Sequence, residues 1–207
     1  MATRQEQRSE ETKASILSAA GRLFSAKGYE AVTMREIAKE AGCSHTTIYI
    51  YFKDKEALLQ QLSLPPLLSL MDEMKRLSEE EVGLDARLEN LSLAFIEFCF
   101  HNRNTYNLFI NVKSGRVDNP APEMEINRVR GSLFNLLTDA LRNCLSLDPA
   151  DERLLTYSRI YFFAIYGIVA TYAHSEETVE GLLERLTPTF RTAFKVLIAG
   201  FREEIGS

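Results

Sequence analysis

The sequence predicts an all-α protein, and three observations support this fold class. Apolar residues recur every three or four positions along most of the 207 residues. Hydroxyl or acidic side chains stand where these stretches begin, and glycine or proline stands where they end. No stretch predicts a strand. Because 45% of the residues are apolar, the chain can bury more than one core. We predict a small N-terminal domain at 1–55 and a larger helical domain at 56–207.

The first helix is predicted from about Ser9 to Ala26. Its apolar side chains form one stripe, and Gly28 follows as its stop. The stripe consists of Ile16, Ala20, Leu23 and Phe24.

A helix-turn-helix is predicted directly after this helix. Thr33 and Glu36 have the spacing of a capping box, which would start the first helix of the motif. Gly42 can adopt the left-handed conformation that ends a helix, and Ser44 can accept a backbone N–H and start the next one. In such a motif the second helix enters the major groove of DNA.

The second helix of the motif carries side chains suited to DNA. Ile48 and Phe52 face a core, which leaves the other faces to polar and aromatic groups. Residues near the N-terminus of a recognition helix reach base edges, and we predict base contacts from Arg35, His45, Thr46 and Thr47. Donors at the margins of the motif predict phosphate contacts from Thr33, Ser44, Tyr49, Tyr51 and Lys55. In the alternative interpretation, both tyrosines are half-buried core residues and Lys55 is a solvated helix start.

A family resemblance rests on residues spread through this region. They are Gly28-Tyr29, Val32-Thr33, Ile37-Ala38, Ala41-Gly42, Ser44, Ile48-Tyr49, Tyr51-Phe52 and Lys55-Glu56-Ala57-Leu58. Over about residues 12 to 60 the chain resembles the N-terminal domain of the TetR family of transcriptional repressors. The resemblance implies an all-helical homodimer in which three N-terminal helices bind an operator half-site. It also implies a C-terminal domain that dimerises and binds a small effector.

The same resemblance implies individual contacts. Phosphate contacts fall on Thr33, Tyr49, Tyr51 and Lys55, and base contacts fall on Arg35, His45, Thr46 and Thr47. Thr46 and Ile50 depart from the residues that the family usually has at these positions. The operator sequence therefore cannot be transferred from a relative.

Charge divides unevenly along the chain. Residues 1–60 hold 9 Lys and Arg against 8 Asp and Glu, which leaves 15 against 21 for the remainder and a total of −5. A bulk basic field cannot supply affinity for DNA in such a protein. We expect the affinity for DNA to come from a few specifically positioned contacts, whose number dimerisation doubles.

Caps and stripes predict the remaining helices. Asp54 and Asp85 each start a helix, a short helix lies around Thr105–Val112, and the polar segment 113–122 is an exposed loop. The next helix has the stripe Val129, Leu133, Leu136, Leu137, Ala140, Leu141 and Cys144.

Prolines divide the C-terminal domain further. Pro65-Pro66 predicts a kink or break in the helix that starts at Asp54, because an interior proline costs about 3 kcal/mol or more. Asp148-Pro149 is predicted to cap the eighth helix, and Ser175 the element after it. Pro188 predicts that the last helix is split or bent.

Several site classes and compartments are not expected. Cys43, Cys99 and Cys144 form no CxxC pair and no secretory signal is visible, so we expect a reduced, cytoplasmic protein. The apolar run 160–173 is too short to span a membrane, which predicts no membrane segment and a helix buried on all sides. His101 and His174 lack acidic or cysteine partners at ligand spacing, so neither a metal nor another cofactor is expected.

Excess apolar surface predicts a homodimer. The helix at 160–173 is apolar nearly all round, and the last helix carries Phe190, Phe194, Leu197, Ile198 and Phe201. By resemblance, these two helices of each subunit form a four-helix bundle. Gly167 would allow close approach of two backbones across it. The alternative is that Gly167 relieves crowding inside one subunit.

An effector cavity is predicted in the C-terminal domain for a medium-sized apolar or aromatic ligand. The candidate lining residues are Phe95, Phe98, Tyr106, Phe109, Phe134, Leu137, Tyr161, Phe162 and Ile165. The alternative is that these side chains are ordinary core residues, because stripes at helical spacing usually are.

These features predict a sequence-specific DNA-binding transcriptional regulator. In the favoured interpretation it is a repressor that binds a palindromic site in double-stranded DNA as a homodimer and is released by a small hydrophobic effector. Two alternatives stay open: a DNA-binding regulator without an effector, and a helical ligand-binding protein. The sequence has no G-x-S-x-G, glycine-rich loop or H-E-x-x-H, so we expect no enzyme.

Overall fold

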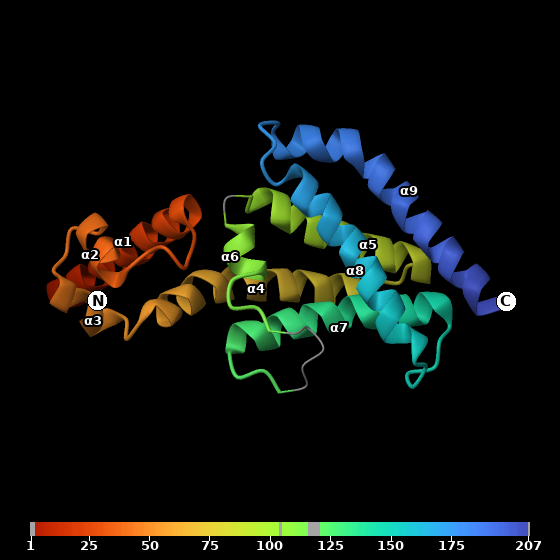
Figure 1. The fold of residues 1–207 in the computed structure, drawn as a ribbon, viewed down its shortest axis with the longest axis horizontal. Helices are drawn as coiled ribbons and strands as arrows, with labels where there is room; N and C mark the ends of the chain where they lie inside the picture. The colour runs from red at the N-terminus through yellow and green to blue at the C-terminus, as the bar shows by residue number, and fades with distance from the viewer. Residues whose placement is uncertain (1–2, 104, 116–120, 207) are drawn as a thin grey trace.

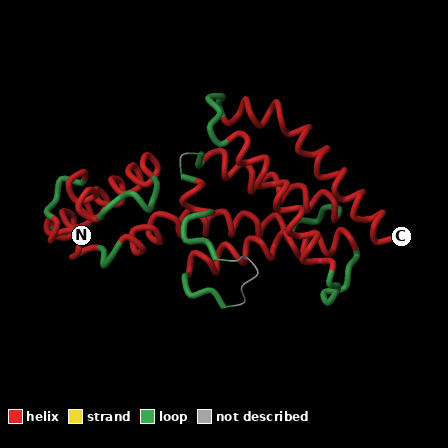
Figure 2. Tube along the Cα trace, viewed as in Figure 1, coloured by secondary structure: helices red, strands yellow, loops and turns green. Residues whose placement is uncertain are grey.

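The computed structural model describes residues 3–103, 105–115 and 121–206. The described residues form helices joined by loops, without any strand, which confirms the predicted fold class (Figure 2). In chain order the helices are α1 (Arg4–Lys27), α2 (Met34–Glu40), α3 (His45–Tyr51), α4 (Lys55–Ser78), α5 (Leu84–His101), α6 (Tyr106–Ile110), α7 (Glu125–Leu145), α8 (Arg153–Tyr172) and α9 (Val179–Gly206).

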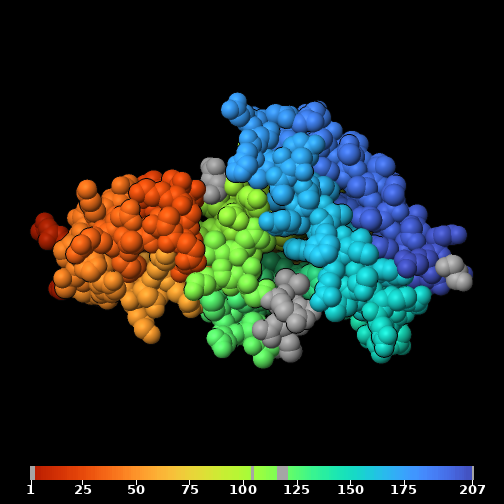
Figure 3. Space-filling view, viewed as in Figure 1, coloured from red at the N-terminus to blue at the C-terminus, as the bar shows by residue number. Residues whose placement is uncertain are grey.

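The molecule is elongated, with α1, α2 and α3 grouped at one end (Figure 1). Helix α4 starts in this group and runs into the larger body, where it packs against α5 and α7. Helices α8 and α9 pack against α5 and form another side of the body. The N-terminal group occupies one end of the surface in Figure 3. Helices α8 and α9 belong to the larger body at the other end.

Helix α1 starts five residues before the predicted position. Thr3 and Glu6 form a capping box, in which the Glu6 backbone N–H donates to Thr3 Oγ1 at 3.2 Å. Along the helix Ala19 is buried and Leu23 is only partly buried. Gly28 follows as predicted, and its φ of +81° is a conformation that favours glycine.

Helix α4 continues through Pro65 and Pro66, so the predicted break is wrong. In Figure 1 its first turns run at an angle to the rest of the helix, which agrees with a bend. Leu58 and Leu59 before the prolines and Leu67 after them are fully buried. Their packing offsets the backbone hydrogen bonds that the prolines remove. Helix α9 likewise continues through Pro188.

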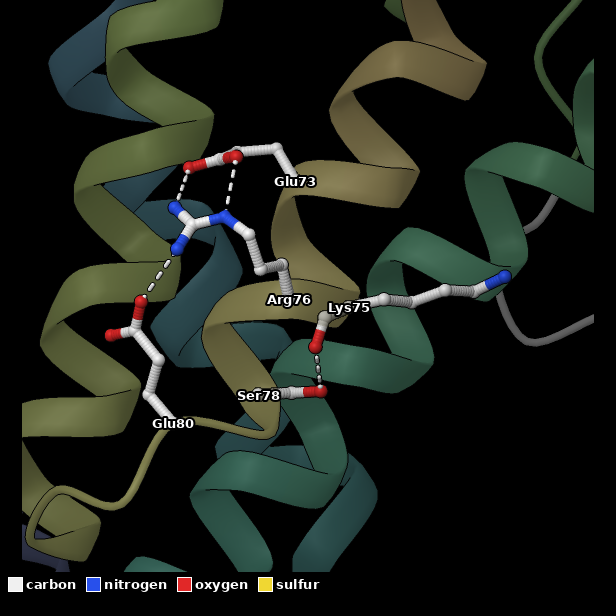
Figure 4. Close-up of polar contacts among 5 residues, drawn as sticks. All are labelled: Glu73, Lys75, Arg76, Ser78 and Glu80. Atoms are coloured by element: carbon white, nitrogen blue, oxygen red, sulfur yellow. Dashed lines mark hydrogen bonds and ion pairs between the residues drawn. The ribbon is translucent and has the colours of Figure 1, made fainter.

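The C-terminal end of α4 carries an exposed ion-pair cluster (Figure 4). Arg76 donates to Glu73 through two nitrogens, at 2.6 and 3.1 Å, and to Glu80 at 2.8 Å. Ser78 Oγ donates to the carbonyl of Lys75 at 2.6 Å. Such solvated pairs contribute little stability, so the buried face of α4 holds the helix in place.

Two predicted helix starts in the C-terminal domain are wrong. Asp148 accepts a hydrogen bond from the Ala150 N–H at 2.8 Å inside a turn, and α8 begins only at Arg153. Ser175 accepts from the Glu177 N–H at 3.2 Å, also inside a turn. Thr178 instead accepts from the Gly181 N–H at 3.1 Å at the start of α9. In both cases a local turn uses the side chain that the sequence pattern assigned to a helix cap.

Helix α8 is buried on one side only within a single chain, which corrects the expectation of burial on all sides. Tyr161 and Ile165 are buried, whereas Phe163 is 66% and Ile160 is 41% exposed. Among the described residues, α8 is the one helix long and apolar enough to cross a membrane by length and composition, and 33% of its most apolar window is buried. A core helix of a soluble protein passes the same test, so this observation is weak evidence for a membrane segment.

The predicted loop 113–122 is described in part. Residues 113–115 and 121 are exposed, as expected for a polar loop, and residue 122 is half-buried. Residues 116–120 lie outside the described residues.

Candidate DNA-binding surface and effector cavity

The helix-turn-helix has the predicted local structure. Thr33 starts α2 with a capping box, and Gly42 takes a φ of +72° in the turn. Ser44 starts α3, where it accepts the Thr47 N–H at 3.0 Å. Ile48 lies on the inner side of α3 and is fully buried. Its packing holds the opposite side of this helix toward solvent.

The side chains that are predicted to contact bases differ in their exposure to solvent. Arg35, His45 and Thr46 are exposed on α2 and α3. Thr47 is half-buried, and its Oγ1 lies 2.7 Å from Ser44 Oγ. The ring of His45 stands edge-on to that of Tyr49, with 5.1 Å between ring centres. Arg35, His45 and Thr46 therefore present polar groups that a base edge can reach without breaking a helix cap.

Thr33 and Glu36 form hydrogen bonds with each other at the start of α2. Thr33 Oγ1 donates to Glu36 Oε2 at 2.9 Å, and the Thr33 N–H donates to the same oxygen at 2.9 Å. Lys27 Nζ lies 3.1 Å from the other carboxylate oxygen. These hydrogen bonds, with the backbone bond from Thr33 the largest cause, lower the pKa of Glu36 to about 2.

Lys55 makes contacts within the protein that its sequence position did not reveal. Its Nζ donates to the carbonyls of Tyr29 at 2.7 Å, Val32 at 3.0 Å and Glu30 at 3.3 Å. An ammonium has three N–H donors, so these carbonyls occupy them. A phosphate contact from Lys55, which remains a prediction, would have to share or replace these hydrogen bonds.

The two tyrosines of α3 occupy different environments. Tyr49 is 47% exposed. Tyr51 is half-buried, and its hydroxyl accepts a hydrogen bond from Ser9 Oγ of α1 at 3.3 Å. Tyr49 therefore fits the predicted phosphate role better than Tyr51, whose hydroxyl also joins α3 to α1.

A cavity of about 340 Å³ lies in the C-terminal domain between α5, α7, α8 and the segment after α6. Four predicted residues line it: Phe95, Phe134, Leu137 and Phe162. The other five do not, and sequence spacing could not separate them because all lie on apolar stripes. Tyr106, Phe109, Tyr161 and Ile165 are buried in the core, and Phe98 packs against Phe109.

Residues that sequence reasoning missed complete this cavity. They are Ile110, Asn111, Ser114, Gly115, Arg130, Leu133, Phe163 and Tyr166. Asn111 Nδ2 donates to the Tyr166 hydroxyl at 2.8 Å. Arg130 carried a usable signal, because a charged residue one turn before Leu133 and Phe134 lies on the buried stripe of its helix.

Arg130 is 6% exposed and binds the end of α6. Its Nε donates to the carbonyl of Phe109 at 2.6 Å, and its terminal nitrogens donate to those of Leu108 at 3.2 Å and Val112 at 3.0 Å. Asn127 Oδ1 accepts a fourth hydrogen bond from Arg130 at 2.9 Å. Burial lowers the pKa of Arg130 to about 10, so it stays cationic at neutral pH and complements the carbonyl end of the helix.

Comparison with known proteins identifies the N-terminal domain. Residues 16–62 match the model of bacterial regulatory proteins of the tetR family. This N-terminal domain is a TetR-family domain. The HTH-type transcriptional regulator HbdR of Aromatoleum sp. (strain CIB) is 28% identical over 206 residues, which span 92% of this chain and 86% of HbdR.

Two solved structures share the fold over most of this chain. FadR from Bacillus subtilis, in complex with stearoyl-CoA, has a TM-score of 0.65 at 20% identity and is matched over 90% of this chain and 98% of FadR. The ketosteroid transcriptional regulator KstR2 of Mycobacterium tuberculosis has a TM-score of 0.68 at 18% identity, over 91% of this chain and 93% of KstR2. HbdR, FadR and KstR2 are each described as transcriptional regulators.

The described residues hold no group of three or more His, Cys, Asp and Glu side chains that could bind a metal. The cysteines are free thiols. Cys144 is buried and donates to Asp85 at 3.1 Å, and burial is the main cause that raises its pKa to about 12. The Cys144 thiol is therefore a poor nucleophile near neutral pH.

Proposed function

We propose that this protein is a cytoplasmic repressor that binds a palindromic operator as a homodimer and is released by a small apolar effector. The observation that carries this proposal is the surface of α2 and α3, where Arg35, His45, Thr46 and Tyr49 are exposed around a fully buried Ile48. Polar groups held on a rigid helix with its caps satisfied are suited to the major groove. The matched family of regulatory proteins supports the same role.

Dimerisation is supported by the exposed face of α8 and α9. Phe163 of α8, which also borders the cavity, and Val196 of α9 are both 66% exposed, and a partner subunit would remove these side chains from water. A Cβ added at Gly167 would meet no atom within 4 Å in the same chain. Crowding inside one subunit therefore does not explain this glycine, and we assign it to close approach of a partner helix.

The effector is proposed to occupy the cavity of about 340 Å³, at the lower end of the range of ligand pockets. Its wall is largely apolar and includes several aromatic rings, with Asn111 and Tyr166 as polar contacts. Arg130 donates to four protein acceptors, so it has little capacity left to bind a carboxylate. We infer an uncharged, compact aromatic or apolar ligand.

Arg130 also offers a connection from the cavity to the DNA-binding domain. It lines the cavity and holds the end of α6, and α6 packs against α4, which starts beside the helix-turn-helix. A ligand that displaces Arg130 or Asn111 would move α6 and therefore α4. Such a ligand releases DNA only if it binds the DNA-free state more tightly.

Binding-site selection from random duplexes tests the DNA-binding role. His45→Ala should change the preferred bases, whereas Tyr49→Phe should weaken binding to all sequences alike, because phosphate contacts carry no base information. Selection of no preferred sequence by the wild-type protein would contradict the proposal and favour a helical ligand-binding protein.

A thermal-shift screen of hydrophobic metabolites and antimicrobials tests the effector role. A true effector should stabilise the wild-type protein and release it from its site. Leu133→Phe, which adds bulk to the cavity wall, should abolish both effects, and Asn135→Ala on the exposed face of α7 should not. Ligands that bind without releasing DNA would contradict the effector model and favour a regulator without an effector.

A further inference from the structure

One exposed side chain of the recognition helix has no hydrogen-bonding group. Ile50 is 75% exposed, and no other large apolar side chain in the described part of the chain is exposed to this extent. Its neighbour two positions earlier, Ile48, is fully buried. Because a helix turns by roughly 100° per residue, Ile50 lies on the side of α3 opposite the core. In the proposed DNA complex this is the side of α3 that faces the major groove.

The neighbours of Ile50 show what this position can read. Thr46 lies one turn earlier on the same face and is also exposed, and Tyr49 flanks the pair. Thr46 can exchange hydrogen bonds with a base edge, whereas Ile50 can only make apolar contact. In the major groove the apolar group of a base pair is the 5-methyl of thymine.

We propose that Ile50 is a specificity-determining residue that packs against the 5-methyl group of a thymine in each operator half-site. This inference rests on the proposed DNA-binding function and adds a chemical feature of the DNA that the site must contain. A solvated isoleucine gains nothing from its exposure in the free protein. Contact with a methyl group removes apolar surface of both partners from water.

Uracil differs from thymine by this methyl group alone, and it therefore isolates the contact. In the selected operator each thymine would be replaced by uracil, one position at a time in both half-sites. Affinity would be measured by fluorescence anisotropy. For the wild-type protein we expect one position at which uracil weakens binding about 4-fold per half-site, or about 15-fold for both, as expected for one buried methyl group.

Ile50→Ala should bind the thymine and uracil operators equally at that position. Its fold should be unaffected, because the side chain is exposed and alanine favours a helix, and a thermal melt checks this. Val82→Ala, which shortens an aliphatic side chain that is 37% exposed far from α3 in sequence, should keep the full sensitivity to uracil.

The outcomes separate this inference from the function on which it rests. A selection without a preferred sequence contradicts the proposed function itself. A preferred sequence that tolerates uracil everywhere contradicts the role of Ile50 and leaves DNA binding intact. The same holds if Ile50→Ala keeps the wild-type sensitivity to uracil, because another residue would then contact the methyl group.

Discussion

Lys55 Nζ donates a hydrogen bond of 2.7 Å to the backbone carbonyl of Tyr29 and lies 4.4 Å from the centre of its ring. It thereby joins the first turn of α4 to the segment between α1 and α2. The ring of Tyr29 is buried, and burial is the main cause that raises its pKa to about 12. The lysine thus helps fix the helix-turn-helix relative to α4, the helix that enters the C-terminal domain.

Replacement of this lysine tests whether its role is structural. Lys55→Met should lower the free energy of unfolding by about 2 kcal/mol, because hydrogen bonds from a charged donor to three carbonyls are lost. Urea denaturation measures this change. Lys53→Met, at an exposed position two residues earlier, should change stability by less than about 0.5 kcal/mol. Unchanged stability with weakened DNA binding would instead assign Lys55 to a phosphate.

Acid should weaken the start of α2 through Glu36. Its pKa in the folded protein is lowered to about 2 from an ordinary value of 4.5. Its contribution to stability is therefore present above pH 4.5 and is lost as the pH falls through about 2. Glu36→Gln should lower the melting temperature most above pH 5, and the difference from wild type should vanish near pH 2. Glu10→Gln, at an exposed site on α1, is the control. A difference that does not depend on pH would exclude this role of the charge.

Removal of the buried guanidinium should destabilise the C-terminal domain. Arg130→Met leaves the carbonyls of Leu108, Phe109 and Val112 without this donor, and we expect a loss of about 3 kcal/mol or more. Arg128→Met, on the exposed face of the same helix, should have little effect. If both variants unfold at the same denaturant concentration, Arg130 does not hold α6.

Added bulk at Gly167 tests the proposed interface. The side chain of Gly167→Leu begins in open space within its own chain, so the subunit should fold while the two subunits separate. Sedimentation should then report monomers for this variant and dimers for Asn135→Leu on α7. A dimer that survives Gly167→Leu would place the interface elsewhere.

Local sequence signals predicted the N-terminal domain well because its helix boundaries are set by neighbouring residues. Thr33 with Glu36, Gly42 and Ser44 each act within four positions, and the structure confirms each of them. Lys55 and Arg130 differ because they bind backbone carbonyls that are distant in sequence. The carbonyls bound by Lys55 lie 23 to 26 residues away, and those bound by Arg130 lie 18 to 22 residues away. No local pattern encodes such pairings, since they depend on how the helices pack.

The same limit applies to the cavity and to the prolines. Phe134 and Phe162 line the cavity whereas Tyr161 and Ile165 fill the core, and only the packing of several helices decides between these outcomes. Pro65 and Pro66 would disrupt an isolated helix, but buried leucines on both sides hold α4 together.

The account depends most on symmetric recognition of DNA, and half-site disruption of the selected operator tests it most directly. Two chains should bind one duplex that contains an inverted repeat, with half-site centres separated by about 34–36 Å, one helical turn. Scrambling either half-site should weaken binding sharply in an anisotropy titration of the full-length protein. Equal affinity for the intact repeat and for duplexes with one scrambled half would contradict the account.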